Sequence, residues 1–290
     1  MNKKESPRCI VCGSSEIEKY IPMKDYSLLR CKKCTIVWDQ NSSRNLLKQY
    51  SKTYFMNENP KGGYANYFEG MRINRKTFTE RLQKAEKVLG KKGKLLDVGC
   101  ALGDCLLEAK KLGWKDSEGI EVSDYAFNFA KERGLKVKKG ILKKDSYPEK
   151  LFDIVTYQDV IEHISGPVSE LKKAKKFIKP GGYIFLVTPD IGGWWHTLLG
   201  SAWYHYKPGE HVVYFSQGSL RKALEKAGFV SIKTKKTYHV LSVEYVFNRL
   251  KYYWPALFEG LLKLVQKSSL KNVSFRAYTG EIEAWGQKPN

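Results

Sequence analysis

Short apolar runs alternate with amphipathic stretches along much of the chain. The apolar runs are bounded by glycine, proline or charged residues, and they predict strands in "KLLDVG", "SEGIEV", "FDIVTYQ" and "YIFLVTPD". The stretches between them predict helices in "DCLLEAKKLG", "SDYAFNFAKERG" and "VSELKKAKKFIKPGG", with Ser123 as an N-terminal cap and Pro180 and Gly181 as a stop. This alternation is typical of an α/β fold in which helices cover both faces of a parallel sheet.

The same kind of pattern extends on both sides of this region. Phe78, Leu82, Ala85 and Leu89 recur at helical spacing, so a helix is expected before the first strand. "SLRKALEKAGF" predicts a helix, "VSIKTKKTY" a strand and "GEIEAWGQ" a last strand. Residues 240–272 are apolar, basic and aromatic and are interrupted by a proline, which predicts a helical insertion before the last strand. This insertion fits either a pair of packed helices or a lid or membrane-surface contact.

Four of the six cysteines form two Cys-x-x-Cys pairs near the N-terminus, and these are Cys9, Cys12, Cys31 and Cys34. The spacing between the pairs falls in the range that is typical of a four-thiolate zinc site. Two such knuckles complete a tetrahedral shell with no open position, so the role of the metal is expected to be structural. Two disulfides or a redox-active pair are the alternatives, and both fit poorly with paired knuckles in a cytosolic chain. The sequence therefore predicts a zinc ribbon over residues 1–40.

Charge and composition narrow the class of protein only in part. The chain has 290 residues and 42% hydrophobic residues, which is enough for one stable α/β domain with small additions. Its net charge of +21 is spread along the chain, which indicates either a lysine-rich solvated surface or an anionic partner such as RNA, a nucleotide-linked substrate or an acidic membrane. Neither a signal peptide nor a membrane span is predicted, so we expect a cytoplasmic protein.

The stretch "LLDVGCALGD" carries the first candidate binding site. Asp97 is expected to end a strand, and Gly99 and Gly103 lie in the turn before a helix. Such a turn could be a cofactor site or only a tight connection, because glycine favours both. Glu121 is expected to end the next strand, where a carboxylate can accept hydrogen bonds from a ribose diol. Since the chain has neither a G-x-G-x-x-G motif nor a P-loop lysine, these residues favour a nucleoside cofactor without phosphates.

With "GIEVS", "LFDIVTYQDVIEHI" and "KPGGYIFLVTPD", this stretch resembles the class I S-adenosylmethionine (SAM)-dependent methyltransferases. The N-terminal cysteines and "EHVVYFS" are similar to the branch with a four-cysteine ribbon and a domain like methyltransferase domain 23. The resemblance implies a Rossmann-like sheet of seven strands whose last strand is antiparallel. It also implies a linker or cap over the cofactor site at 41–72 and a methyltransferase domain at 73–290.

The resemblance further implies which residues bind the cofactor. Asp97, Gly99 and Gly103 would surround the methionine part of SAM, and Glu121 would bind the ribose. The residues after Gly140 would line the adenine. The expected set also includes Ala101, Val122, Gln158 and Asp159, of which the last two would face the methyl-transfer cavity. Ala101 stands where many members have glycine, but its side chain is small enough to permit binding.

Methyl transfer to a hydroxyl or a carbon acid also needs a base, and histidines are the candidates. His196, His205 and His211 lie in "WWHTLLGSAWYHYKPGEHVVYFS", just after the fourth apolar run. Glu210 beside His211 suggests a base with a carboxylate neighbour, and His163 is the other candidate. Alternatively, this segment is a hydrophobic cover with incidental histidines, and His163 has a structural role.

These features predict a SAM-dependent methyltransferase that acts on a small or carrier-linked acceptor. Oxygen in a glycan precursor or in a quinone-like lipid is the expected acceptor atom. An RNA methyltransferase, a sugar C-methyltransferase and a non-catalytic SAM-binding docking protein remain alternatives. Pro208 stands where such sugar enzymes tend to have tyrosine, which weakens that alternative.

Overall fold

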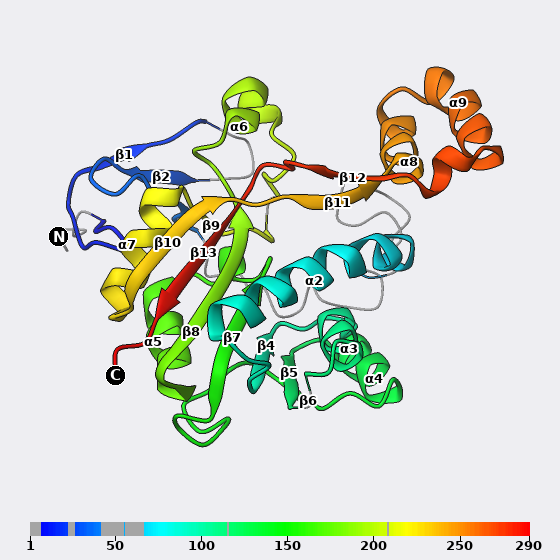
Figure 1. The fold of residues 1–290 in the computed structure, drawn as a ribbon. Coiled ribbons are helices and arrows are strands. Elements are labelled where there is room, and N and C mark those ends of the chain that lie inside the picture. The colour runs from blue at the N-terminus through cyan, green and yellow to red at the C-terminus, as the bar shows by residue number, and fades with distance from the viewer. Residues whose placement is uncertain (1–6, 23–26, 42–54, 56–66, 115, 208) are drawn as a thin grey trace.

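A seven-stranded sheet forms the centre of the computed structural model, in the order β10-β13-β8-β7-β4-β5-β6 (Figure 1). The structure describes all residues except 1–6, 23–26, 42–54, 56–66, 115 and 208. The strands are β4 (Leu95–Val98), β5 (Ser117–Glu121), β6 (Val137–Lys139), β7 (Phe152–Gln158), β8 (Ile178–Pro189), β10 (Val230–Lys236) and β13 (Glu281–Gln287). Neighbouring strands from β6 to β8 are parallel, whereas β13 is antiparallel to both β8 and β10. The predicted α/β sheet with a reversed last strand is therefore confirmed.

Helices cover both faces of this sheet, as the alternating pattern predicted (Figure 1). They are α2 (Tyr67–Leu89), α3 (Asp104–Lys111), α4 (Asp124–Glu132), α5 (Pro167–Phe177) and α7 (Gln217–Ala227). Successive residues of β4 point to opposite faces, so Leu95 packs in the cluster under α2 and α3 while Leu96 packs in the cluster under α5 and α7. Each face thus has its own apolar core, and the sheet between them is buried on both sides.

The local signals for helix ends agree with the structure at one helix and differ from it at another. The Ser123 hydroxyl accepts a hydrogen bond from the Ala126 amide and caps α4, as predicted. The helix that was predicted to start at Val168 and to stop at Pro180 and Gly181 ends earlier, at Phe177, and β8 begins at Ile178. Ile178 pairs with Phe152 on β7, so tertiary pairing with the neighbouring strand takes these residues from the helix.

The N-terminal segment forms a small sheet that includes a strand from the main domain. Its order is β1 (Ile17–Lys19), β2 (Leu28–Cys31), β3 (Val37–Asp39) and β9 (Val213–Tyr214). Val37 and Trp38 of β3 pair with the two residues of β9. The segment that carries the cysteines is therefore joined to the main domain by backbone hydrogen bonds and by a shared apolar core.

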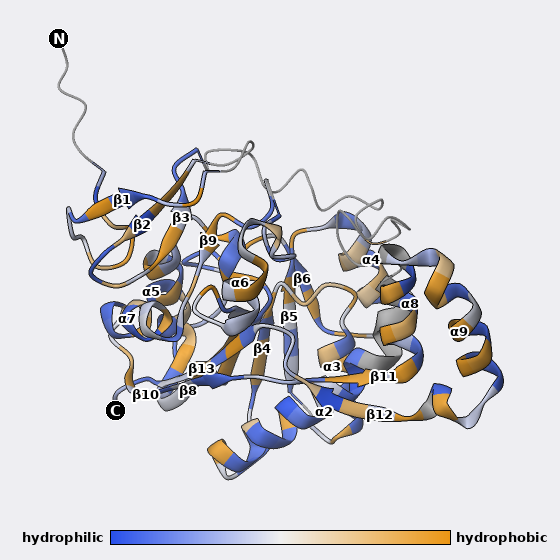
Figure 2. Ribbon diagram, turned by 90° about the horizontal axis from the view of Figure 1, so that it is seen from above, coloured by the Kyte–Doolittle hydropathy of each residue, from blue (hydrophilic) through white to orange (hydrophobic). Residues whose placement is uncertain are grey.

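The predicted helical insertion projects from the sheet on a two-stranded arm (Figures 1 and 2). The arm consists of β11 (His239–Ser242) and β12 (Ser274–Ala277), and it carries α8 (Val243–Tyr253) and α9 (Pro255–Lys267). Three short helical segments, Ile161–His163, Gly200–Ala202 and Ser269–Asn272, and helix α6 (Trp194–Leu199) complete the described elements. No helix within the described residues is long and apolar enough to cross a bilayer.

The expected linker or cap at 41–72 lies mostly outside the described residues. Helix α2 begins at Tyr67, which is before the expected domain boundary at residue 73. Phe55 is described and its side chain is buried against Leu102 and Ala126. These contacts place at least one residue of the segment beside the turn that follows β4.

Candidate active site

A cavity of about 300 Å³ opens at the carboxyl ends of β4, β5 and β7. In an open parallel sheet this edge is where ligands bind. The cavity is lined by all but one of the predicted cofactor residues, namely Asp97, Gly99, Ala101, Glu121, Val122, Gln158 and Asp159. Gly103 does not line it but shapes the turn beside it. The structure thus brings together residues that are separated by up to two βα units in the sequence.

The turn after β4 needs small residues for two physical reasons. Gly99 and Gly103 have φ angles of +70° and +82°, a left-handed conformation that side chains disfavour. A Cβ atom on Gly99 would lie 2.6 Å from Val160, and one on Gly103 would lie 2.4 Å from Leu135. Ala101 is also left-handed, with φ of +47°, at the position where the family resemblance implies glycine. The backbone of this turn is therefore held in a strained shape, which is frequent at ligand sites.

Glu121 holds this turn in place from the end of β5. Its carboxylate accepts one hydrogen bond from the Ala101 amide, at 2.8 Å, and another from the Ser123 amide, at 2.7 Å. Burial raises the pKa of Glu121, while these backbone amides act to lower it. The carboxylate lines the cavity, so it is available for a further polar contact with a bound nucleoside.

Asp97 contributes a buried carboxyl group at the end of β4. It accepts a hydrogen bond of 2.5 Å from the Thr156 hydroxyl. Burial raises the pKa of Asp97 to about 6, and hydrogen bonds from Thr156 and Gln158 limit the rise. An ammonium group beside this carboxyl would stabilise its ionised form. The carboxylates of Asp97 and Glu121 therefore fit a ligand that carries both a positive charge and a ribose.

The opposite end of the cavity is polar and contains two residues that the sequence did not single out. Arg81 from α2 and His239 from β11 line the cavity together with Gln158, Asp159 and His163. The Arg81 guanidinium donates a hydrogen bond of 3.1 Å to the Gln158 side chain. Arg81 lies in a segment that showed only helical spacing, and His239 falls between the predicted strand "VSIKTKKTY" and the predicted insertion, so no local motif marks either residue.

The histidine-rich segment after β8 lies behind this end of the cavity. His196, His205, His211 and Glu210 are not among the cavity-lining residues. His211 is buried, which lowers its pKa well below the usual range, and its ring meets that of His163 edge to face at 4.8 Å. The Glu210 carbonyl accepts a hydrogen bond from His163 Nδ1 at 2.8 Å. His163 therefore reaches the cavity, whereas His211 and Glu210 support it from behind.

Glu162, His163 and His211 bring their ligating atoms within 4.8 Å of one another. Glu162 already accepts a hydrogen bond from Thr188 at 3.0 Å, and His163 Nδ1 is bonded to the Glu210 carbonyl. Burial lowers the pKa of His163 to about 4, which keeps its ring neutral at physiological pH. These contacts show a buried polar cluster that is tied into the protein.

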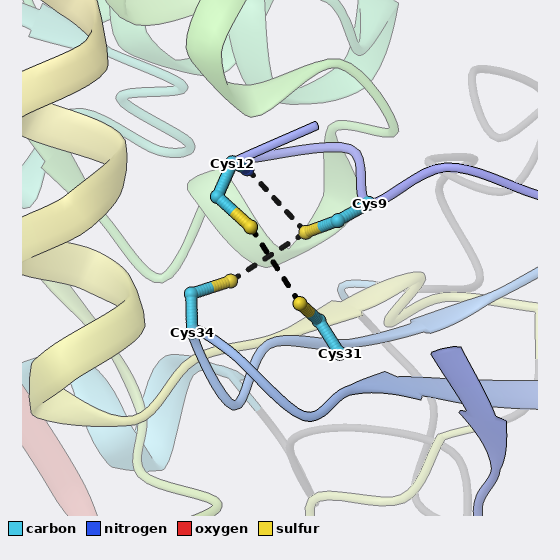
Figure 3. Close-up of side chains that lie close together, drawn as sticks. All are labelled: Cys9, Cys12, Cys31 and Cys34. Carbon is cyan, nitrogen blue, oxygen red and sulfur yellow. Dashed lines mark hydrogen bonds between the residues drawn. The ribbon is translucent and has the colours of Figure 1, made fainter. Parts of the chain in front are cut away.

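The four N-terminal cysteines converge on one point (Figure 3). The Sγ atoms of Cys9 and Cys34 are 3.5 Å apart, and those of Cys12 and Cys31 are 3.6 Å apart. These distances exceed a disulfide bond of about 2.05 Å, and all four thiols are free. They are close to the separation of about 3.8 Å that a tetrahedral zinc site with Zn–S bonds of about 2.3 Å requires. The arrangement fits a four-thiolate metal site.

The fold and the cavity define a class of protein. The structure combines a seven-stranded sheet whose last strand is antiparallel with a cavity beside the glycine-containing turn after β4 and the acid at the end of β5. This is the Rossmann-like fold of the SAM-dependent class I methyltransferases. A methyltransferase-domain family matches residues 70–234, more than half of the chain, and the chain belongs to this family.

Individual relatives agree with this assignment. The ubiquinone biosynthesis O-methyltransferase of Pectobacterium atrosepticum is 28% identical over 128 residues, which is 41% of this chain and 52% of the relative. The protein of the same name from Photorhabdus laumondii is 27% identical over 60% of this chain and 74% of the relative. The chain thus spans about half the length of the first of these relatives. A SAM-dependent methyltransferase from Archaeoglobus fulgidus shares the fold, with a TM-score of 0.53 at 18% identity over 77% of this chain and 99% of that chain.

Asp97→Asn tests the role of the buried carboxyl group. Removing a charge-assisted contact of about 1.5–3 kcal/mol is expected to weaken S-adenosylhomocysteine binding by roughly 10- to 100-fold. In the wild type, affinity should fall below pH 6 because Asp97 takes up a proton, and the variant should lack this step. Calorimetry between pH 5 and 8 measures both effects, with Asp116→Asn as an exposed control that keeps wild-type affinity.

The same variant is expected to weaken binding without lowering the free energy of unfolding. The folded-state pKa is raised above the ordinary value of 3.8, so the folded protein holds a proton that the unfolded chain releases between these values. Ionisation of Asp97 therefore lowers the free energy of unfolding as the pH rises through this window. Denaturant unfolding of Asp97→Asn at pH 7.5 should show no loss of stability. A large decrease in the free energy of unfolding would contradict the hypothesis that the Asp97 charge contributes to binding and not to stability.

Proposed function

We propose that the protein transfers a methyl group from SAM to a hydroxyl group of a quinone-like lipid. The observation that carries the proposal is one cavity with two chemically different ends. Asp97 and Glu121 stand at the cofactor end, and Arg81, Asp159 and His239 stand at the other. The relatives named ubiquinone biosynthesis O-methyltransferases support oxygen as the acceptor atom.

In this proposal, SAM supplies a methyl group that its sulfonium centre already activates. The protein binds and orients the two reactants and excludes water from the cavity. Glu121 holds the ribose diol, Asp97 pairs with the ammonium group, and the turn at Gly99 leaves room for the methionine part. Gln158 and Asp159 stand at the other end, beside Arg81 and His239, and align the acceptor. Positioning of this kind can contribute roughly 7–11 kcal/mol to the lowering of the barrier.

A lipid-linked acceptor fits the exposed surface of the insertion. Trp254, Leu257, Leu261 and Leu264 are exposed on or next to α9, while Leu262 and Val265 of the same helix are buried. The exposed apolar residues lie at helical spacing and are accompanied by exposed Lys263 and Lys267. A basic helix of this kind suits an anionic membrane face. We therefore propose a peripheral membrane contact through residues 240–270.

The other acceptor classes have less support from the site. The aromatic residues that could stack on a glycan, Trp194, Trp195, Trp203 and Tyr206, do not line the cavity. An RNA acceptor was suggested by the net charge of +21. The exposed leucines of α9 are apolar and favour a lipid surface over a phosphate backbone. Sugar C-methylation would require a base from the histidine-rich segment after β8, and that segment lies behind the cavity.

We also propose that residues 1–40 form a zinc ribbon that stabilises the protein. Cys9, Cys12, Cys31 and Cys34 would supply four thiolates. The Val11 and Cys12 amides each donate a hydrogen bond to Cys9 Sγ at 3.4 Å, which stabilises a thiolate at that position. The ribbon shares a core with α7 and β9, so metal binding would also stabilise the main domain.

The acceptor class is tested with a catechol that carries a short prenyl chain. Wild-type protein with SAM is expected to form S-adenosylhomocysteine and the mono-O-methyl ether, measured by mass spectrometry. The catechol without the chain should react with a higher KM because it loses apolar contacts. Total tRNA serves as the competing acceptor. Methylation of tRNA without methylation of any catechol would contradict the proposal.

Metal analysis tests the ribbon. The purified protein is expected to contain one zinc ion per chain. The double variant Cys9→Ser/Cys34→Ser should lose the metal and melt at a lower temperature, because a structural zinc site contributes free energy of folding. Cys100→Ser, which changes a buried cysteine outside the cluster, should retain full zinc content. A wild-type chain with far less than one zinc ion would contradict the assignment.

Vesicle flotation tests the membrane contact. Wild-type protein should float with vesicles that contain phosphatidylglycerol and less with phosphatidylcholine alone. Leu257→Ser/Leu264→Ser removes two exposed apolar side chains, each worth roughly 1.5–3 kcal/mol when fully buried, so binding should fall at least about tenfold. Leu198→Ser is the control, since Leu198 on α6 is 68% exposed, similar to Leu264 at 65%. Equal flotation of both variants would argue against this surface.

A further inference from the structure

Two ionisable residues meet where the two-stranded arm leaves the central sheet. His239 is the first residue of β11, and Glu281 is the first residue of β13. His239 lines the cavity with a half-buried ring, and Glu281 is buried directly behind it. The two residues are far apart in the sequence and come together because β13 returns to the sheet beside the start of the arm.

The contacts of His239 Nε2 with Glu281 and Arg81 are the basis for assigning its tautomer. Its Nε2 atom is hydrogen-bonded to Glu281 Oε2, and the Arg81 guanidinium lies 3.2 Å from the same Nε2 and 3.8 Å from the same carboxylate oxygen. Nε2 thus lies between a carboxylate, which can only accept a hydrogen bond, and a guanidinium, which can only donate one. We assign the proton to Nε2 because its contact with Glu281 is the shorter of the two. The positive charge of Arg81 then stabilises the negative charge of Glu281. In a neutral ring, the lone pair is consequently on Nδ1.

Nδ1 of His239 is open to a ligand. Within the described residues no group hydrogen-bonds to it, and it is absent from the buried polar atoms that lack partners. Because His239 lines the cavity, an acceptor in the cavity can reach this atom. His163 also lines the cavity, but its Nδ1 is already bonded to the Glu210 carbonyl.

Glu281 is held in its ionised form by its surroundings. Burial alone would raise its pKa, but the charge and hydrogen bond of His239, together with Arg81, hold the pKa of Glu281 below its usual range. Asp159 from the end of β7 also faces this group, and burial and the Glu281 charge raise its pKa. His205 is the fourth neighbour within reach of these charges. An ionised Glu281 beside Nε2–H is the arrangement that stabilises a protonated imidazole.

We propose that His239 is the general base for the acceptor hydroxyl and that Glu281 is its positioning residue. The inference rests on the proposed O-methyl transfer. As the acceptor oxygen bonds to the methyl carbon, the carbon–sulfur bond breaks and its electron pair stays on sulfur. The hydroxyl proton passes to Nδ1 of His239, and Glu281 stabilises the resulting imidazolium through Nε2–H. The proton later leaves to solvent, so the products are the methyl ether, S-adenosylhomocysteine and one proton.

Matched substitutions test the two roles with the prenylated catechol. His239→Gln is expected to lower kcat by about 10²- to 10⁴-fold, the usual contribution of a general base. Affinity for S-adenosylhomocysteine should stay within about twofold, because His239 lies at the other end of the cavity. His196→Gln is the control, since His196 is a buried histidine that packs among aromatic rings and does not line the cavity. Wild-type kcat in His239→Gln would overturn the inference.

The pH profile separates positioning from a structural role. Glu281→Gln keeps a hydrogen-bond acceptor but removes the charge that favours the imidazolium. The limb over which kcat rises with pH should therefore move to lower pH, and the plateau rate should fall. Glu283→Gln is the control, because Glu283 lies on the same strand, is buried and pairs with Lys84 outside the cavity. An unshifted limb in Glu281→Gln would remove Glu281 from the mechanism.

A measurement without the acceptor distinguishes failure of this inference from failure of the proposed function. ¹⁵N NMR of the imidazole groups, with His239→Gln to assign the signal, should show His239 protonated on Nε2. A proton on Nδ1 would overturn the dyad whatever the acceptor is. Wild-type protein that binds S-adenosylhomocysteine but methylates no catechol would contradict the proposed function, and the inferred base for a hydroxyl acceptor would be withdrawn with it.

Discussion

The hydrogen bond from the Ala101 amide to the Glu121 carboxylate is the contact on which the cofactor end of the cavity depends. It ties the turn after β4 to the end of β5, and the Ser123 amide anchors the same carboxylate from the start of α4. Without a fixed acceptor at this point, a turn with left-handed residues at 99, 101 and 103 would have no reason to keep its strained shape. The same carboxylate is also positioned to bind the ligand. One side chain therefore both shapes the site and lines it.

Local sequence signals were sufficient for this end of the site. The apolar run before Asp97, the glycines after it and the acid at the end of the next strand are each recognisable within a few residues. The rule that parallel strands present their carboxyl ends at one edge then brings these residues together. For the same reason the parallel strands and their helices followed from the pattern, whereas the reversed last strand was implied by the family resemblance. The chief error was local, where pairing of Ile178 with β7 ended a predicted helix early.

The acceptor end could not be predicted in this way. Arg81 reaches the cavity because α2 packs across the sheet face, and His239 reaches it because an arm begins where β13 returns. Neither placement follows from a motif or from residue spacing. The histidine-rich segment contains three histidines that were candidate bases. In the structure, the histidine rings of this segment pack among Trp203, Tyr206 and Tyr214. The local sequence pointed to His163, which does line the cavity, and to the buried histidines behind it, whereas the long-range topology places His239 at the cavity as well.

The two ends of the cavity also treat charge in opposite ways. Asp97 is buried with hydrogen bonds but no cation, so its ionised form is disfavoured until a positively charged ligand arrives. Glu281 is equally buried, but His239 and Arg81 keep it ionised before any ligand binds. At the Asp97 end, a bound cation stabilises a carboxylate whose ionised form is disfavoured by burial, which increases the affinity of the site for a cation. The Glu281 end keeps a negative charge ready beside the ring that gains a positive one, so less reorganisation is needed during the reaction. Such a site would bind the methyl donor because its positive charge stabilises the ionised form of Asp97. It would favour the reaction of the methyl acceptor because Glu281 is already ionised beside His239.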